Sequence, residues 1–199
     1  RRLDRLISDI SDASRLDAEL ARFDMAEVDL SAVLQAVVGV AQSVDRGDGV
    51  RVEFDLARAP ALENGRRPWR VLGHDSRLGQ VFNNLIDNAR SFSEPGGVVR
   101  VSLKPARGTG ANGGREGYEA IVDDDGPGIP AHAFERIFER FYTDRPNQGF
   151  GQNSGLGLSI SRQIVEAHNG RIRAMNRTDP KDPERPLGAR FTVWLPAAP

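Results

Sequence analysis

Cysteine is absent from the 199 residues of this chain. Disulfides, thiolate zinc sites and thiol nucleophiles are therefore excluded. An excess of one charge is also absent, because 27 Lys and Arg residues against 28 Asp and Glu residues leave a net charge of -1. This balance does not indicate a nucleic-acid surface, so we expect no nucleic acid as a partner. Any anionic ligand must instead be held by a local arrangement of groups.

Long apolar runs are missing as well. The longest stretches stay well below the ~20 apolar residues that a membrane-spanning helix needs, and no signal core follows the first charged residues. We therefore expect this chain, as given, to be soluble, and its start at Arg1 suggests a fragment of a longer parent. What is present, 39% hydrophobic and 28% charged residues, is typical of a soluble globular protein. The length suits one well-cored domain with an appendage.

The first 23 residues have an amphipathic helical pattern, with apolar residues at three- and four-residue spacings. Such a helix requires a partner helix. A terminal helix lying on its own domain is the alternative, because the register slips between the two halves of the apolar stripe. We divide the chain into residues 1–25, which hold this helix and a linker, and residues 26–199, which form the main domain. The apolar positions are Leu3, Leu6, Ile10, Ala13, Leu16, Leu20 and Phe23.

The main domain alternates between helical and strand patterns. A Gly-rich loop at 105–117 joins two strands as a hairpin connection. Helices combined with mostly hairpin-type strands predict an α+β fold, a two-layer α/β sandwich whose mixed sheet carries its helices on one face. Helices are predicted at 32–44, 77–90, 131–141 and 156–168, and strands at 50–56, 69–72, 98–104, 118–122, 171–175 and 189–195.

Three consecutive aspartates precede a glycine turn at residues 123–130, DDDGPGIP. They follow an apolar strand, so a carboxylate at a strand end meets a backbone that can approach a ligand closely. Taken alone, this motif is weak, because acidic residues beside glycine also form plain turns.

A second glycine motif, Gly155-Leu156-Gly157-Leu158, opens an apolar helix. Glycines before a helix let backbone N–H groups and the positive end of the helix dipole face phosphate oxygens. It is not a Walker loop, because no Gly-Lys-Ser/Thr follows, and it is not a dinucleotide fingerprint either.

Asparagines form a third motif on the helix predicted at 77–90. Asn84 and Asn88 are four residues apart and share one face, where amide oxygens suit a hard cation such as magnesium. Asparagine is a poor helix former and needs a reason to be there. The alternative is a hydrogen-bonded cap or a contact between helices.

In this order and at this separation, the three motifs resemble the asparagine box and the two glycine boxes of the Bergerat (GHKL) ATPase fold. Histidine kinases, gyrase B, Hsp90 and MutL share that fold, and the resemblance runs from about Asp29 to Pro196. Residues 137–142, IFERFY, are similar to the phenylalanine box of histidine kinases, and residues 75–89 fit the asparagine-box helix of that branch. The resemblance implies the ATP-binding kinase domain of a two-component sensor histidine kinase. Residues 1–25 then resemble the end of a dimerisation hairpin.

The resemblance also implies roles for individual residues. Asp124 would accept from the adenine amino group, Asn88 would hold Mg²⁺, and Asn84 would lie on the phosphate side. An ATP lid is expected at about 143–154. The departures are Ser91-Phe92 where relatives have Lys-Tyr, Asn153 for a glycine, and Thr143 for a lid arginine, so Arg90 and Arg145 become candidate substitutes. The expected nucleotide-binding residues are Asn84, Asn88, Arg90, Phe92, Asp124, Gly126, Gly128, Ile129, Phe138, Tyr142, Arg145, Ser154, Gly155, Leu156, Gly157 and Leu158.

Histidine kinases transfer the ATP γ-phosphoryl to a histidine on a dimeric helical hairpin, and then to an aspartate of a response regulator. None of the three histidines here fits that acceptor. His74 lacks the proline of the acceptor motif, and His132 and His168 look structural, so we expect no catalytic residue in this chain. The expected partners are a second copy, through the hairpin of the full-length parent, and a receiver domain, with the parent anchored in the inner membrane.

Two alternatives stay open at this point. The first is an ATPase or serine kinase of the same fold, such as an anti-sigma-factor kinase, against which the phenylalanine box and the leading helix argue. The second is a nucleotide-gated binding module in which no transfer occurs, which the departures at 91, 143 and 153 keep open.

Overall fold

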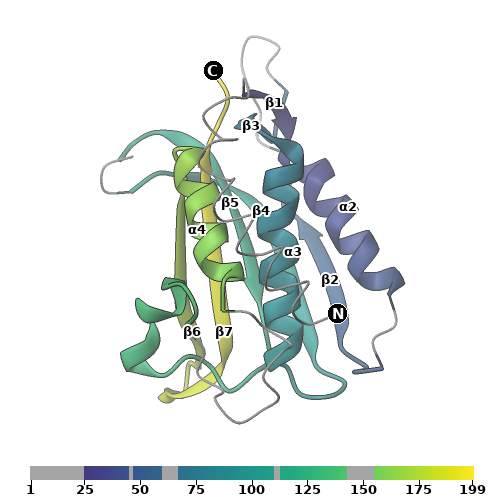
Figure 1. The fold of residues 1–199 in the computed structure, drawn as a ribbon, viewed down its shortest axis with the longest axis vertical. Coiled ribbons are helices and arrows are strands. Elements are labelled where there is room, and N and C mark those ends of the chain that lie inside the picture. Colours follow the sequence, from purple (N-terminus) through teal and green to yellow (C-terminus); the bar gives the residue numbers. More distant parts are fainter. Residues whose placement is uncertain (1–24, 45–46, 60–66, 110–112, 143–154) are drawn as a thin grey trace.

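The computed structural model describes residues 25–44, 47–59, 67–109, 113–142 and 155–199. The helix predicted within residues 1–25 therefore lies outside the described residues, apart from Met25. The described part contains two sheets, three α-helices and two short 3-10 helices (Figure 1).

A mixed five-stranded sheet forms one layer of the fold, with strand order β2-β4-β5-β7-β6. The pair β2–β4 is parallel, whereas β4–β5, β5–β7 and β6–β7 are antiparallel. This confirms the predicted α+β architecture with a mixed sheet. The strands are β2 (Arg51–Leu56), β4 (Val98–Arg107), β5 (Glu116–Asp123), β6 (Arg171–Asp179) and β7 (Asp182–Pro196).

Three helices cover one face of this sheet (Figure 1). They are α2 (Leu30–Ser43), α3 (Asp75–Phe92) and α4 (Gly157–Ala167). Their apolar faces bury residues such as Leu34, Leu85 and Ile164, which are fully buried. The core therefore lies between the helix layer and the sheet, and the other face of the sheet carries no helix in the described part of the chain.

The sequence also misplaced some elements. The helix expected at 131–141 is wrong, because two short 3-10 helices take its place, η2 (Ala131–Ala133) and η3 (Arg136–Phe138). After η3 the backbone becomes extended at Glu139 and reaches a positive φ of 64° at Phe141, which no α-helix contains. The strands of the 105–117 hairpin extend to Arg107 and from Glu116, so the connection is shorter than predicted.

A small antiparallel ribbon adds to the expected elements, and only its second strand, expected at 69–72, was predicted. It pairs β1 (Ala26–Asp29) with β3 (Arg70–Gly73). At the start of α2, Asp29 is the N-cap, and its Oδ1 accepts from the backbone N–H of Ser31 at 3.1 Å and of Ala32 at 3.2 Å. β1 has only four residues, too few to show a clear period-2 pattern, which explains why it was missed.

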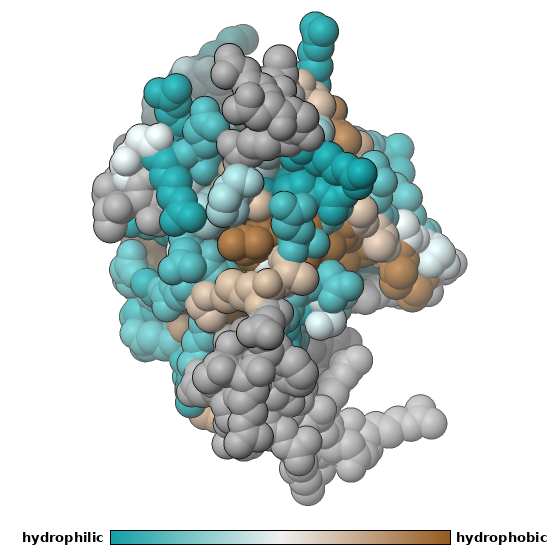
Figure 2. Space-filling view, turned by 90° about the horizontal axis from the view of Figure 1, so that it is seen from above, coloured by the Kyte–Doolittle hydropathy of each residue, from teal (hydrophilic) through white to brown (hydrophobic). Residues whose placement is uncertain are grey.

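Seen from the end that carries this ribbon, the surface is largely hydrophilic, with smaller hydrophobic areas between the polar side chains (Figure 2). Single exposed apolar residues such as Met25 and Leu72 are normal on a protein surface. Among the described residues, no helix combines the length and the apolar character that crossing a membrane requires.

Candidate nucleotide-binding site

Asp124 lies directly after β5 and is only 2% exposed. Its Oδ1 accepts two backbone hydrogen bonds, from Gly126 N–H at 2.9 Å and from Ala189 N–H at 2.9 Å. Burial raises the pKa of this carboxyl, and the two backbone donors oppose that effect. The fold therefore fixes one oxygen of a carboxylate that is costly to keep charged.

Three glycines permit close packing around the loop that follows β5. A Cβ on Gly126 would lie 2.7 Å from the carbonyl oxygen of Phe92, and one on Gly188 would collide with the carbonyl of Asp124. Gly128 has a φ of 81°, and its Cβ would lie 2.9 Å from Oδ1 of Asn176. The glycines are thus required by close packing as well as by backbone conformation.

A hollow of about 360 Å³ lies beside this loop. Phe92 and Ile129, both predicted site residues, line it. Asp124 itself is not one of the described residues that line it. Among the described residues, the lining consists of Phe92, Pro127, Gly128, Ile129, Pro130, Asn176 and Pro186.

The asparagine helix meets the second glycine motif. Nδ2 of Asn84 donates to the carbonyl of Gly157 at 3.2 Å and to Oγ of Ser161 at 3.3 Å. Asn88 lies one turn further along α3 and is half-buried. The structure therefore brings Asn84 to the N-terminus of α4, where the first backbone N–H groups have no partner within the helix.

The phenylalanine box holds the second glycine motif in place. The backbone N–H of Phe141 donates to the carbonyl of Gly155 at 3.0 Å. Phe138 is 9% exposed and packs edge-to-face on Phe191, with ring centroids 6.4 Å apart. This corrects the expectation that Phe138 contacts the nucleotide, because its ring belongs to the core. Tyr142 stacks under the guanidinium of Arg136, 4.7 Å from the ring centroid.

Arg90 is a further correction. Its side chain is 4% exposed and pairs with Oδ1 of Asp48 at 2.8 Å, and its Nη1 donates to the carbonyl of Ala41 at 2.9 Å. A buried guanidinium held in this way is not available to phosphate, so Arg90 does not replace the usual lysine. The other predicted contacts Arg145 and Ser154, and the lid at 143–154, lie outside the described residues.

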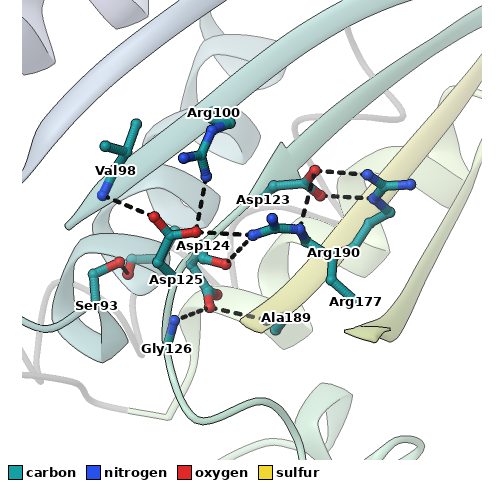
Figure 3. A network of polar contacts seen from close by, with 11 residues as sticks. Ser93, Val98, Arg100, Asp123, Asp124, Asp125, Gly126, Arg177, Ala189 and Arg190 are labelled. Atoms are coloured by element: carbon teal, nitrogen blue, oxygen red, sulfur yellow. Dashed lines mark hydrogen bonds and ion pairs between the residues drawn. The ribbon is translucent and has the colours of Figure 1, made fainter. Parts of the chain in front are cut away.

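Flanking Asp124, two aspartates face arginines on the helix-free side of the sheet (Figure 3). Arg190 binds Asp123 through two hydrogen bonds of 2.7 Å each. Arg100 binds Asp125 at 2.8 Å. Burial would raise the pKa of Asp125, but the hydrogen bonds from Arg100 and Arg177 outweigh it, and the pKa stays below its usual range.

Sequence reasoning missed Asn176 and Arg177 on β6. Asn176 Oδ1 accepts from the Ile129 N–H at 2.7 Å, and its Nδ2 donates to the Ile129 carbonyl at 2.9 Å. Arg177 donates to the Asp124 carbonyl at 2.7 Å. The sequence does show an asparagine followed by an arginine directly after the strand predicted at 171–175. No motif, however, connects these two residues with the glycine turn about 50 residues earlier.

The sequence model described as histidine kinase-, DNA gyrase B-, and HSP90-like ATPase matches residues 73–199. The chain belongs to this family. It is 49% identical over its whole length to the sensor protein ChvG of Agrobacterium fabrum, and 51% identical to that of Rhizobium meliloti. These matches cover 32% and 33% of the two relatives, so the chain spans about a third of their length.

Solved structures agree with this assignment. A mycobacterial sensor histidine kinase, MprB, is 30% identical and superimposes with a TM-score of 0.66, over 88% of this chain and 99% of that one. Full-length ShkA in complex with AMPPNP shares the fold, with a TM-score of 0.74 over 99% of this chain and 37% of that one, at 24% identity. The chain is thus the catalytic ATP-binding domain of the sensor histidine kinase type, as the motifs predicted.

Proposed function

We propose that this domain binds Mg-ATP with the adenine base at Asp124 and the phosphates toward the N-terminus of α4. The observation that carries the proposal is the carboxylate of Asp124. Among the described residues, its hydrogen bonds end on Oδ1. Oδ2 is therefore the oxygen that accepts from the adenine amino group, and Phe92 and Ile129 supply apolar contacts to the base.

The contact between α3 and α4 supports the proposed position of the phosphates. Asn84 ties α3 to Gly157, so the amides of the first turn of α4 and the asparagine face lie together. Backbone donors at a helix N-terminus bind phosphate oxygens without a lysine. This arrangement supports phosphate binding although Arg90 is engaged elsewhere.

The site also fits a magnesium ion. Asn88 offers a hard amide oxygen, and Mg²⁺ is usually held by one or two protein ligands together with phosphate oxygens and water. Among the described residues, no group of three His, Asp or Glu side chains could hold a metal alone. Bound Mg²⁺ would neutralise phosphate charge, and Asn88 would orient it.

In the longer parent, we propose that the γ-phosphoryl of ATP passes to a histidine outside this chain and then to an aspartate of a response regulator. The identity to ChvG sensor proteins over the whole chain supports this. Catalysis here would consist of positioning and charge neutralisation, without a covalent intermediate on this domain. The parent would act as a homodimer anchored in the inner membrane, with this domain in the cytoplasm.

Calorimetric titration with a non-hydrolysable ATP analogue, with and without magnesium, tests the binding step. Saturable binding that magnesium strengthens is expected for the wild type. Asp124→Ala should weaken binding by about 1–3 kcal/mol, or roughly one to two decades of affinity, because the adenine amine loses its acceptor.

Glu139→Ala is a matched control, since this exposed carboxylate pairs only loosely with Arg136, at 3.8 Å. Its affinity should equal that of the wild type. If the wild type binds no analogue under any condition, the proposal is wrong. A version extended upstream to include an acceptor histidine should also phosphorylate itself, which separates a kinase from a nucleotide-gated binding module.

A further inference from the structure

Two neighbouring residues of β6 contact the loop at residues 123–130, which we call the adenine loop. They reach it from opposite faces of the sheet. Asn176 lines the hollow and makes two hydrogen bonds to the backbone of Ile129, at 2.7 Å and 2.9 Å. Arg177 lies on the other face, among the aspartates (Figure 3). Successive side chains of a strand point to opposite faces, so this division follows from the strand itself.

Arg177 contacts three consecutive residues at once. Its Nη1 donates to the carbonyl of Asp124 at 2.7 Å and to Oδ1 of Asp125 at 3.0 Å, and its Nε lies 3.7 Å from Oδ2 of Asp123. Its side chain is 23% exposed, so these contacts are partly shielded from water. A planar guanidinium with five donors can bind three acceptors in this way, whereas an ammonium group cannot reach all of them from one point.

Without this arginine, the main chain of Asp124 would lose its contact with a cation. Asp123 retains Arg190, and Asp125 retains Arg100, but neither of these arginines binds the main chain of Asp124 in the described structure. On the opposite side, α3 presents the backbone carbonyl of Phe92 to the loop. Arg177 is thus the cation tied to the residue that the adenine base needs.

We infer that Arg177 is a positioning residue of the adenine site, which holds the main chain of Asp124 and places a positive charge among three consecutive aspartates. This inference rests on the proposed function. It extends that function to a residue that does not touch the nucleotide. Asn176 completes the grip by holding the far end of the loop at Ile129.

The test compares three variants with the wild type, by calorimetry with the ATP analogue and Mg²⁺ between pH 5 and pH 8. Arg177→Gln should bind the ATP analogue about tenfold more weakly at pH 7.5, because a residue that holds a binding group in place is lost. Burial raises the pKa of Asp124, and attraction to Arg177 opposes this effect; removing Arg177 should therefore raise this pKa further and move the acidic loss of binding to higher pH. A purely structural role would weaken binding without moving this pH profile.

Arg100→Gln is the matched control, because it removes an arginine that pairs with Asp125 and whose side chain is 45% exposed. Its affinity should stay within about twofold of the wild type and its pH profile should not move. If the pH profile of binding moved as far in Arg100→Gln as in Arg177→Gln, the inference would be wrong, because the effect would then not be specific to Arg177. Unchanged affinity and pH profile in Arg177→Gln would also overturn it.

Arg177→Lys keeps the charge but loses the planar fork. It should bind the ATP analogue more weakly than the wild type while retaining the wild-type pH profile. If Arg177→Gln does not fold, Arg177→Lys still tests the inference. Wild-type affinity in Arg177→Lys would overturn the positioning role. The outcomes distinguish the two proposals. If the wild type does not bind the ATP analogue, the proposed function is wrong. If the wild type binds and Arg177→Gln has the same affinity and pH profile, only this inference is wrong.

Discussion

The two faces of the five-stranded sheet are held by different forces. On the helix-covered face, side chains such as Val101, Leu103 and Val193 are buried against α2, α3 and α4. On the other face, arginines and aspartates pair across β4, β5, β6 and β7 (Figure 3). Apolar burial is worth about 25 cal/mol per Å², whereas partly exposed ion pairs contribute little.

The difference shows how the two faces divide their tasks. The covered face stabilises the domain, and the ionic face shapes one loop. Asp124 lies where the two meet, with its side chain buried and its carbonyl bound by Arg177. We therefore expect nucleotide binding to depend on contacts that contribute little to stability.

Removing a large core side chain should give the largest effect. Leu85 is fully buried on α3, and Leu85→Ala should lower the free energy of unfolding by about 2–5 kcal/mol through lost burial and the cavity left behind. Urea unfolding at pH 7.5 measures this. A change below about 1 kcal/mol would mean that the covered face does not dominate stability.

Asp124→Asn should separate stability from binding. Because burial raises the pKa of Asp124 in the folded state, the ionised form costs stability at neutral pH, and the neutral amide should leave the free energy of unfolding unchanged or higher. ATP-analogue affinity should still fall by about 1–3 kcal/mol, since an amide N–H can then face the adenine amine.

A guanine nucleotide provides the control for that variant. Guanine carries a carbonyl acceptor where adenine carries an amine. Asp124→Asn should therefore reduce the preference for adenine over guanine. A variant that keeps the full wild-type preference would show that Asp124 does not read the base.

His168, on the helix-covered side of the sheet, should have a smaller, pH-dependent effect on the free energy of unfolding. It is 1% exposed, its Nδ1 donates to the Ile164 carbonyl at 2.7 Å, and its Nε2 accepts from the His74 N–H at 3.1 Å. Burial lowers its pKa, so the unfolded state binds the proton more readily.

Stability should therefore fall as pH drops below about 6.5, the pKa of an unfolded histidine, by at most about 1.4 kcal/mol per pH unit from this group. Urea unfolding at pH 7 and pH 5 measures the change. His168→Gln should flatten the dependence over that interval, and an equally steep dependence in the variant would assign it to other groups.

Removing an arginine from the ionic face should give the smallest effect. Arg100→Gln breaks an exposed pair with Asp125 and should change the free energy of unfolding by less than about 1 kcal/mol. Added salt should reduce even this difference, because it screens exposed charges. A larger, salt-independent loss would show that the ionic face stabilises the fold as well as the loop.

Helices and strands with strong periodicity were predictable from the sequence. The pattern at 77–90 became α3 and that at 156–168 became α4, because each buries one apolar stripe. The segment at 131–141 was not predictable in this way, because Phe138 must reach the core while Phe141 turns back to Gly155. Those two contacts overrule its helical spacing.

The same limit applies to the site. Asp124, the glycines and the asparagines lie in short motifs whose order indicates the family. Arg90 looked like a phosphate ligand because it follows the asparagine box, yet Asp48, which lies before β2, captures it. Its partner lies 42 positions away, so local sequence could not reveal that pair.

The sequence by itself determined the family, the mixed α+β fold and the carboxylate, glycine and asparagine motifs, because these depend on local periodicity and on residue types at fixed spacing. Only the tertiary structure decided which charges meet. Asn176, Arg177 and Gly188 reach the adenine loop because strand pairing places β6 and β7 beside β5. Pairing between distant strands depends on the packing of the whole domain, and no local pattern encodes it.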